Sequence, residues 1–342
     1  MSFFIYLFSF IFLFSTCYAF PTEYKMSDSN RLDVLKQALD KIAQSSDLLI
    51  SFSAFHIDSG EHIYINPSHS FPMASTAKLL FALTLLDLVD RGHLDLNDRL
   101  SLRSTELRPY SVLSKLFHSP DITLTLKNCL NGMMVYSENT LTDIIYHKIG
   151  GKKAINQFLK QQDLSSIKIS RSILETIAAS DGVPVTDDSY QSLVTYNQHY
   201  YSLTISQEEK KRKQFFKDTR DHISGPEFID LLVKFYQKKL ISETSTTQLL
   251  SILKRSYSGK NRLSGLLPQT TVYHKTGSFS HLSNDVGFIL LPENKGTLVI
   301  AASVQDRFPE RLPDTDQMKT ARDNMIALLT KTVYDFFIFS SL

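Results

Sequence analysis

Three short motifs in this chain carry side chains that are suited to acyl transfer. The first, Ser75-Thr76-Ala77-Lys78, places a hydroxyl and an amine three residues apart. Residues with this spacing share one face of a helix, so the Lys78 amine can reach the Ser75 hydroxyl. A lysine beside a buried helix also loses its proton more readily than a lysine in water. The motif therefore predicts Ser75 as a nucleophile and Lys78 as its base.

The second motif, Ser137-Glu138-Asn139, lies between two stretches with helical patterning. The Ser137 hydroxyl can pass a proton between a leaving nitrogen and the lysines, and the Asn139 amide can hydrogen-bond a substrate amide. We therefore assign Ser137 to catalysis and Asn139 to substrate binding. Glu138, between them, is interpreted as a structural residue.

The third motif, Lys275-Thr276-Gly277, is expected to end a strand near the C-terminus. Lys275 offers a cation for a substrate carboxylate, and Thr276 offers a hydroxyl beside it. Gly277 lets the strand backbone approach a ligand without an intervening Cβ. The N–H of the next residue, Ser278, is a candidate partner for the Ser75 N–H in an oxyanion hole.

The Ser-x-x-Lys spacing is common by itself, since residues 165–168 and 251–254 also match it. Only Ser75 comes where an extended segment meets an apolar helix, predicted over 76–91. There the backbone N–H groups and the positive end of the helix dipole can face a developing oxyanion. The alternative is that Ser75 only caps that helix.

The elements that must position these motifs are predicted to build one sheet from both ends of the chain. Near the N-terminus, apolar spacing predicts a helix over 31–46. A hairpin of two strands, over 48–57 and 62–65, is predicted to follow it. Helical patterning dominates the middle of the chain, over 76–91, 123–160 and 226–255. Strand patterning returns near the end, over 271–274, 285–291 and 297–304. A last helix is predicted over 315–337. This order predicts an α/β (α+β) fold, with an antiparallel sheet flanked by terminal helices plus an inserted all-helical domain.

We expect residues 20–342 to form one catalytic domain. Its α/β part is predicted at about 30–75 and 260–342, and its helical part at about 76–259. Within the helical part, residues 186–224 form a polar, tyrosine-rich insertion that ends in a run of charges. We interpret it as a solvated surface insertion, and the alternative is a lid over a cleft.

The N-terminus predicts export. Residues 3–14 are almost purely apolar, but a membrane-spanning helix needs about 20 such residues. A small-residue stretch follows, so we expect a signal peptide over residues 1–19, cleaved after Ala19, and a periplasmic or secreted protein. An uncleaved anchor is the alternative. Cleavage leaves Cys129 as the single cysteine, in an apolar stretch where a buried inert thiol is expected.

The overall composition excludes several other functions. The 342 residues are 42% hydrophobic and carry a net charge of +2, so nucleic acid is not expected as a partner. The chain contains no H-E-x-x-H and no pair of C-x-x-C motifs, and its ten His are scattered. We therefore predict neither a metal site nor a cofactor.

The sequence around the three motifs resembles the class A β-lactamases and other penicillin-recognising active-site-serine hydrolases. Residues 71–78 (FPMASTAK) are similar to the family's F-P-M-A-S-T-x-K, and residues 122–151 and 266–287 resemble its second-motif and third-motif regions. The resemblance covers the mature chain apart from the tyrosine-rich insertion. It implies an α domain packed on an α/β domain, with the serine at their junction and a β-lactam opened through a Ser75 acyl-enzyme.

One segment departs from the family pattern. Class A enzymes carry R-x-E-x-x-L-N after the second motif, and its Glu activates the deacylating water. Here residues 171–178 are R-S-I-L-E-T-I-A, so Glu175 comes four residues after Arg171 instead of two. We interpret Glu175 as an acid that pairs with Arg171 to hold the loop, and a general base in a differently folded loop is the alternative.

This departure leaves three functions open. The first is a β-lactamase-like hydrolase that acts on β-lactams. The second is a penicillin-binding, peptidoglycan-directed acyl hydrolase, which would acylate at Ser75 and then turn over β-lactams slowly or not at all. The third is a non-catalytic cell-wall binding protein that keeps the fold.

Overall fold

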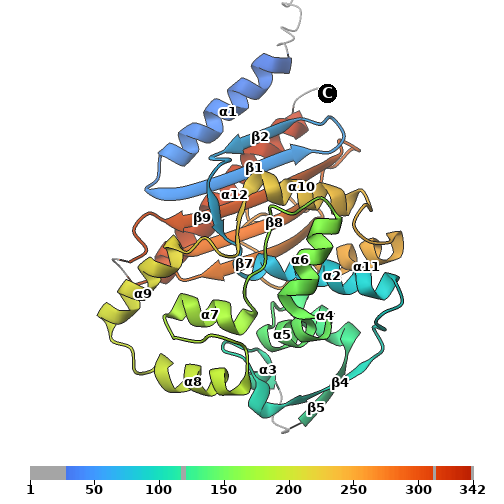
Figure 1. Cartoon of the computed structure of the whole chain (residues 1–342). Coiled ribbons are helices and arrows are strands. Elements are labelled where there is room, and N and C mark those ends of the chain that lie inside the picture. Colours follow the sequence, from blue (N-terminus) through green and yellow to red (C-terminus); the bar gives the residue numbers. More distant parts are fainter. Residues whose placement is uncertain (1–27, 117–120, 311–312, 340–342) are drawn as a thin grey trace, which may run out of the picture.

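Strands from both ends of the chain form an antiparallel sheet in the order β2-β1-β9-β8-β7 (Figure 1). The computed structural model describes residues 28–116, 121–310 and 313–339, so the predicted signal peptide lies outside the described part. The five strands are β1 (Leu48–His56), β2 (His62–Ile65), β7 (Val272–Phe279), β8 (Leu282–Leu290) and β9 (Thr297–Asp306). The predicted antiparallel sheet is confirmed, and β7 continues through the third motif instead of ending there.

The sheet separates two hydrophobic cores because successive strand residues point to opposite faces. Helices α1 (Asp28–Gln44) and α12 (Asp316–Phe339) cover one face, as predicted for the terminal helices. The β9 residues packed in that core are aliphatic: Leu298, Ile300, Ala302 and Val304. The alternate residues Val299 and Ala301 belong to the other core, which the helical part of the chain fills.

The helical part surrounds α2 (Lys78–Asp90), whose first nine residues are all buried. A helix that is apolar on every side needs neighbours all around it, and it contacts helices from several parts of the chain. The other helices here are α3 (Leu113–Leu116), α4 (Leu126–Val135), α5 (Asn139–Lys148), α6 (Gly151–Gln161), α7 (Ile173–Asp181), α8 (Tyr190–Tyr200), α9 (Ile205–Lys217), α10 (Gly225–Tyr236) and α11 (Glu243–Leu253). The edge strand β7 lies next to this part of the molecule (Figure 1).

Two short two-stranded sheets add to the helical part. Strand β4 (Arg99–Arg103) pairs with β5 (Asp121–Thr125), and β3 (Ser70–Pro72) pairs with β6 (His222–Ser224). The sequence pattern did not predict them, since strands of three to five residues are too short for a clear alternation. The β3–β6 pair has a structural consequence, because it brings the end of the tyrosine-rich segment beside the residues that precede Ser75.

The tyrosine-rich segment, residues 186–224, is folded into α8, α9 and β6. Ser189 caps α8, and Thr204 and Gln207 form a capping box at the start of α9. Its lysines are exposed, but Tyr196, Phe215 and Asp221 are buried. The segment therefore packs against the fold through aromatic side chains.

Candidate active site

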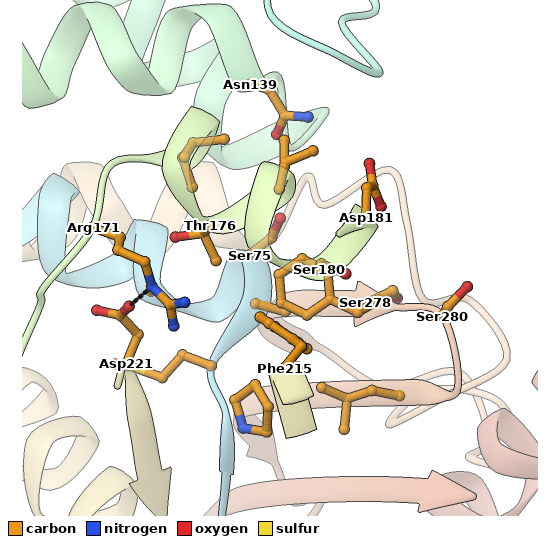
Figure 2. Close-up of a pocket in the computed structure, with 18 of the residues that line it drawn as sticks. Ser75, Asn139, Arg171, Thr176, Ser180, Asp181, Phe215, Asp221, Ser278 and Ser280 are labelled. Carbon is orange, nitrogen blue, oxygen red and sulfur yellow. Dashed lines mark hydrogen bonds and ion pairs between the residues drawn. The ribbon is translucent and has the colours of Figure 1, made fainter. Parts of the chain in front are cut away.

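Ser75 lies in η1 (Ala74–Ala77), a short 3-10 turn between β3 and the start of α2. The preceding residue, Ala74, has φ +49°, in the left-handed region that a non-glycine residue adopts at a cost. Neither η1 nor α2 is capped by a side-chain hydrogen bond from a described residue, so Ser75 is not an N-cap. Its side chain lines a pocket of about 390 Å³ (Figure 2).

Lys78 is fully buried at the first turn of α2. Its Nζ donates to the Ser137 carbonyl at 2.6 Å, to Ser137 Oγ at 3.2 Å and to Asn139 Oδ1 at 2.8 Å. Among the described residues, the hydrogen-bond partners of Lys78 are therefore in the second motif. The expected contact with the Ser75 hydroxyl is not one of these hydrogen bonds. Burial lowers the pKa of Lys78 from 10.5 to about 7, although the nearby Glu138 and Asp143 carboxylates oppose the shift. A substantial neutral fraction at physiological pH is what a lysine base requires.

The Ser137 hydroxyl joins the two lysines of the site. Lys275 Nζ donates to Ser137 Oγ at 3.1 Å and to the Thr276 carbonyl at 2.8 Å. Burial, and then the neighbouring Lys78, lower the pKa of Lys275 well below its usual range. Ser137 itself has φ +56°, so its backbone is held in a strained conformation at the centre of the site.

The other two residues of the second motif have separate roles. Asn139 lines the pocket, and its Nδ2 donates to the Pro109 carbonyl at 2.9 Å, so Lys78 and Pro109 fix the orientation of its amide. Glu138 is buried and accepts a hydrogen bond from the Leu141 N–H at 2.6 Å. Glu138 is therefore the N-cap of α5, which confirms that it is structural.

The third motif lies on β7, the edge strand of the sheet, and its residues are buried. A Cβ on Gly277 would lie 2.8 Å from the Met73 carbonyl oxygen and 3.1 Å from the Ser75 nitrogen. Only glycine therefore allows β7 to approach η1 this closely. Thr276 Oγ1 lies 2.6 Å from Ser258 Oγ, and Ser278 Oγ accepts from Arg262 Nη2 at 2.7 Å.

We expect Gly277→Ala to slow acylation of Ser75 by about ten- to a hundred-fold, because β7 must move away from η1 and misplaces the reacting groups. Stopped-flow kinetics with an acylating β-lactam would measure the rate. Gly60→Ala is the control for backbone strain alone, since Gly60 has φ +75° but nothing lies within 4 Å of its Cβ position. An acylation rate for Gly277→Ala equal to that of the control would contradict the close approach.

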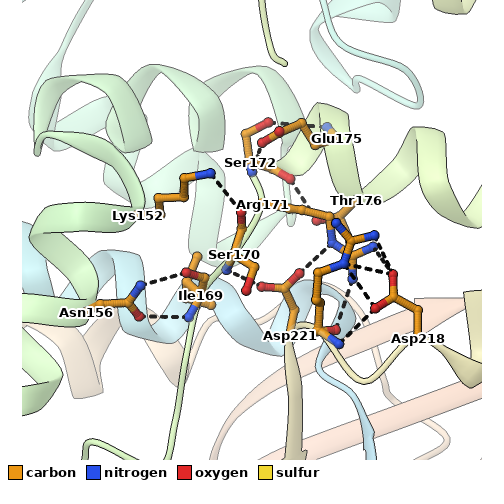
Figure 3. A network of polar contacts seen from close by, with 11 residues as sticks. Lys152, Asn156, Ile169, Ser170, Arg171, Ser172, Glu175, Thr176, Asp218 and Asp221 are labelled. Atoms are coloured by element: carbon orange, nitrogen blue, oxygen red, sulfur yellow. Dashed lines mark hydrogen bonds and ion pairs between the residues drawn. The ribbon is translucent and has the colours of Figure 1, made fainter. Parts of the chain in front are cut away.

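The loop after the second motif is held by a buried ion pair (Figure 3). Arg171 Nε donates to Asp221 Oδ2 at 2.6 Å, and Asp221 Oδ1 accepts from the Ser170 N–H at 2.6 Å. Arg171 also reaches Asp218 Oδ2 at 3.2 Å. These contacts join the two ends of the segment that carries α7, α8 and α9.

Glu175 does not take part in that ion pair. Its Oε2 accepts from the Ser172 N–H at 2.7 Å, and its own N–H donates to Ser172 Oγ at 3.2 Å. The two residues form a capping box at the start of α7. Glu175 is structural as interpreted, but the predicted pairing with Arg171 is wrong, since Asp221 and Asp218 take that place.

The first turn of α7 is anchored to α5 by a second carboxylate. Asp143 is buried and accepts from the Ile173 N–H at 2.8 Å, from the Leu174 N–H at 3.1 Å and from Arg108 Nε at 2.9 Å. Ile173 stands two residues after Arg171, at the place where the class A pattern has its glutamate. Its side chain lines the pocket, so an apolar group occupies that position.

We expect Arg171→Ala to lower the free energy of unfolding by about 3 kcal/mol, because it leaves the buried Asp221 carboxylate uncompensated. Urea unfolding would measure the change. Arg220→Ala is the matched control, since it removes an arginine that is 60% exposed and pairs with Asp218; we expect a change of at most about 1 kcal/mol. Equal effects of the two substitutions would show that the Arg171–Asp221 pair does not hold the segment.

Several residues of the pocket were not predicted from the sequence. They come from α7, from α9 and from the loop before α3, and they include Tyr110, Thr176, Ile177, Asp181 and Phe215. No motif marks these positions, because only the folding of α7 and α9 over η1 places them beside Ser75. For the residues of α7, the sequence offers one indication that they act together, because residues 173, 176, 177, 180 and 181 share one helical face.

Two further features have side chains of the kind found in reactive or ligand-binding sites. His281, Asp306 and Asp314 have the donor atoms of a metal site, but the buried Arg322 guanidinium binds both carboxylates and already supplies their cation. Cys129 is buried, and burial raises the pKa of its thiol to about 11, as expected for an inert thiol.

Comparison with known proteins identifies the fold and its relatives. A family model described as the Beta-lactamase enzyme family matches residues 34–337. The extended-spectrum beta-lactamase PER-1 of Pseudomonas aeruginosa is 26% identical over 313 residues, which cover 89% of this chain and 87% of that protein. A beta-lactamase of Bacteroides uniformis is 26% identical over 90% of this chain and 92% of its own. The crystal structure of the TLA-1 extended-spectrum beta-lactamase has the same fold, with a TM-score of 0.71, 24% identity, and coverage of 90% of this chain and 99% of that chain.

Proposed function

This chain belongs to the β-lactamase enzyme family and is a serine hydrolase, and on that basis we propose that it opens β-lactams by forming an acyl-enzyme on Ser75. The observation that carries the proposal is the position of the Ser137 hydroxyl. It lies within hydrogen-bonding distance of both Lys78 and Lys275, and Lys78 also donates to Asn139, which lines the same pocket as Ser75. Nucleophile, base and proton carrier are thus gathered at one place.

In the acylation step, Ser75 Oγ attacks the β-lactam carbonyl carbon and neutral Lys78 takes its proton. The N–H groups of Ser75 and Ser278 stabilise the oxyanion that forms. Ser137 then delivers a proton to the ring nitrogen as the C–N bond breaks, and Lys78 replaces the proton that Ser137 gave. Lys78 Nζ and Ser137 Oγ are already 3.2 Å apart, so this transfer needs no rearrangement.

Two other groups bind the substrate without reacting. The Lys275 ammonium and the Thr276 hydroxyl pair with the carboxylate that β-lactams carry. The negative charge of that carboxylate favours the protonated form of Lys275, which burial disfavours. The side-chain amide of Asn139 forms a hydrogen bond with the amide of the substrate side chain.

A peptidoglycan-directed acyl hydrolase is the second candidate function. It is favoured by one observation, the isoleucine at position 173, because the acid of the class A pattern is absent from its usual place. Such an enzyme would acylate with a β-lactam but release the product slowly. The attack on the carbonyl carbon is the same in both candidates.

We also propose that the protein is exported and acts outside the cytoplasmic membrane, after cleavage of residues 1–19. In the described part of the chain, the helices are all too short or too polar to cross a bilayer. Edman sequencing of the mature protein should begin at Phe20. An N-terminus at Met1 in membrane fractions would support an uncleaved anchor instead.

Acylation and turnover are tested together by mixing the full mature protein with the chromogenic cephalosporin nitrocefin and recording both absorbance and intact mass. We expect a transient adduct on the tryptic peptide that contains Ser75, accompanied by hydrolysis. An adduct that persists without turnover would favour the second candidate. No adduct and no hydrolysis would exclude both.

A further inference from the structure

We propose that Asp181 is the carboxylate that activates water for hydrolysis of the Ser75 acyl-enzyme. The inference rests on the acylation proposed above and concerns only the step that follows it. It assigns the second half-reaction to a residue outside the three motifs, on the far end of α7.

The first argument is the place of Asp181 in the pocket. Five residues of α7 line the pocket, and their spacing puts them on one face of the helix: Ile173, Thr176, Ile177, Ser180 and Asp181. Glu175 is not on this face, and its carboxylate is used in the capping box with Ser172. Of the acidic residues on α7, Asp181 alone lines the same pocket as Ser75 (Figure 2).

The second argument comes from the hydrogen bonds of the other carboxylates. Three described acids line the pocket, but Asp221 is bound through both oxygens to Arg171 and to the Ser170 N–H. Asp314 is bound through both oxygens to Arg322, and one oxygen also accepts from the His281 N–H. Neither acid has an oxygen free to accept a proton from water.

Asp181 has a different set of partners. Its Oδ2 accepts from the Tyr196 hydroxyl at 2.6 Å and from the Tyr110 hydroxyl at 3.1 Å. Within the described residues Oδ1 has no hydrogen-bond partner, so it remains available to a water molecule. The two tyrosines hold the carboxylate in position by one oxygen and leave the other to react.

The charges around Asp181 suit a base. Burial raises the pKa of the Asp181 carboxyl, and the hydrogen bonds from Tyr196 and Tyr110 counteract part of that rise. From α9, Arg212 also lowers the pKa and Glu208 raises it. The Tyr110 hydroxyl also lies 3.1 Å from the Tyr200 hydroxyl, which accepts from it. A carboxylate whose pKa is raised accepts a proton from water more readily.

The step balances as an ester hydrolysis. The water oxygen attacks the acyl carbonyl carbon while Asp181 Oδ1 takes one of its protons, and the new C–O bond forms as the oxyanion develops. The oxyanion collapses, the bond from the carbonyl carbon to Ser75 Oγ breaks, and Oγ takes the proton that Asp181 accepted from the water. The product leaves as a carboxylic acid, and Asp181 is again a carboxylate.

The test compares Asp181→Asn with Glu175→Gln in single-turnover reactions with nitrocefin, followed by intact mass. For Asp181→Asn we expect adduct formation within about two-fold of wild type and adduct breakdown at least a hundred-fold slower. For Glu175→Gln we expect breakdown at the wild-type rate, because that carboxylate only caps α7. Thermal unfolding of both variants shows whether each one is folded.

The Tyr196→Phe variant provides an independent readout that a merely structural role of Asp181 would not move. The Tyr196 hydroxyl stabilises the charged form of Asp181, so its removal raises the pKa of the carboxyl. The acidic limb of the deacylation rate should therefore shift to higher pH, with the rate at high pH preserved. This measurement keeps the proposal falsifiable if Asp181→Asn does not fold.

Three results would overturn the proposal. Wild-type breakdown of the adduct in Asp181→Asn shows that another group is the base. A wild-type adduct that persists shows that no base acts at all, and it leaves the acylation by Ser75 intact. Absence of any adduct shows that the proposed function itself fails, and the inference fails with it.

Discussion

Replacement of Ser75 with alanine is expected to abolish the covalent adduct and to lower β-lactam hydrolysis by about 10⁴-fold or more, since removal of a nucleophile leaves only the contribution of binding and the oxyanion hole. Intact mass after exposure to nitrocefin measures the adduct, and absorbance measures the turnover. The loss should occur without a change in thermal stability, because the Ser75 hydroxyl caps neither η1 nor α2.

The chain contains its own matched control for this substitution. Residues 251–254 repeat the Ser-x-x-Lys spacing on α11, where Ser251 and Lys254 are exposed. Ser251→Ala should therefore keep the full activity and the full adduct. If Ser75→Ala retained the adduct, or if Ser251→Ala lost it, the assignment of the nucleophile would be wrong.

Replacement of Lys78 with methionine is expected to slow acylation by about 10² to 10⁴-fold, the usual contribution of a positioned base. In the wild type, the acylation rate should rise with pH with a midpoint near 7, because the neutral amine is the active form and burial lowers its pKa to about 7. The variant should lose this midpoint. Stopped-flow measurements between pH 5 and 9, on the order of one point per half unit, test both expectations.

The pH dependence of the free energy of unfolding, compared between the wild type and Lys78→Met, is a second test of the lowered pKa of Lys78. The folded protein binds this proton more weakly than the unfolded chain, so the free energy of unfolding should rise between pH of about 7 and 10.5. Lys275, whose pKa is also lowered, contributes a rise of its own, so Lys78→Met should show a smaller rise than the wild type, and Lys254→Met, at an exposed position, should retain the full rise. A pH profile of acylation that is unchanged in Lys78→Met would exclude Lys78 as the base.

These two predictions concern acylation, which the structure describes more completely than the release of product. The segment between Arg171 and Asp221 explains the difference. It carries three helices, is closed at its neck by the Arg171–Asp221 pair and is anchored by Asp143. An isoleucine then occupies the usual place of the acid, and the carboxylate that reaches the pocket is eight residues farther along α7.

The sequence by itself determined the reacting groups and most of the elements that carry them. The spacing of Ser75 and Lys78, the apolar helix that follows and the late strand around Lys275 are all local patterns. Helical and strand periodicities depend on residues a few positions apart, so they can be recognised without knowledge of the fold. The capping role of Glu138 also follows from its immediate neighbours.

The tertiary structure decided which of these groups meet and which acid can act. Three segments match Ser-x-x-Lys, and the one at Ser75 brings its lysine to Ser137 and its backbone against Gly277 of β7, which supports Ser75 as the proposed nucleophile. Arg171 finds its partner Asp221 fifty residues away, and not the nearby Glu175. Asp181 reaches the pocket because α7 lies across it, held by contacts from α5 and α8. Such long-range contacts depend on the packing of whole elements, which no local pattern encodes.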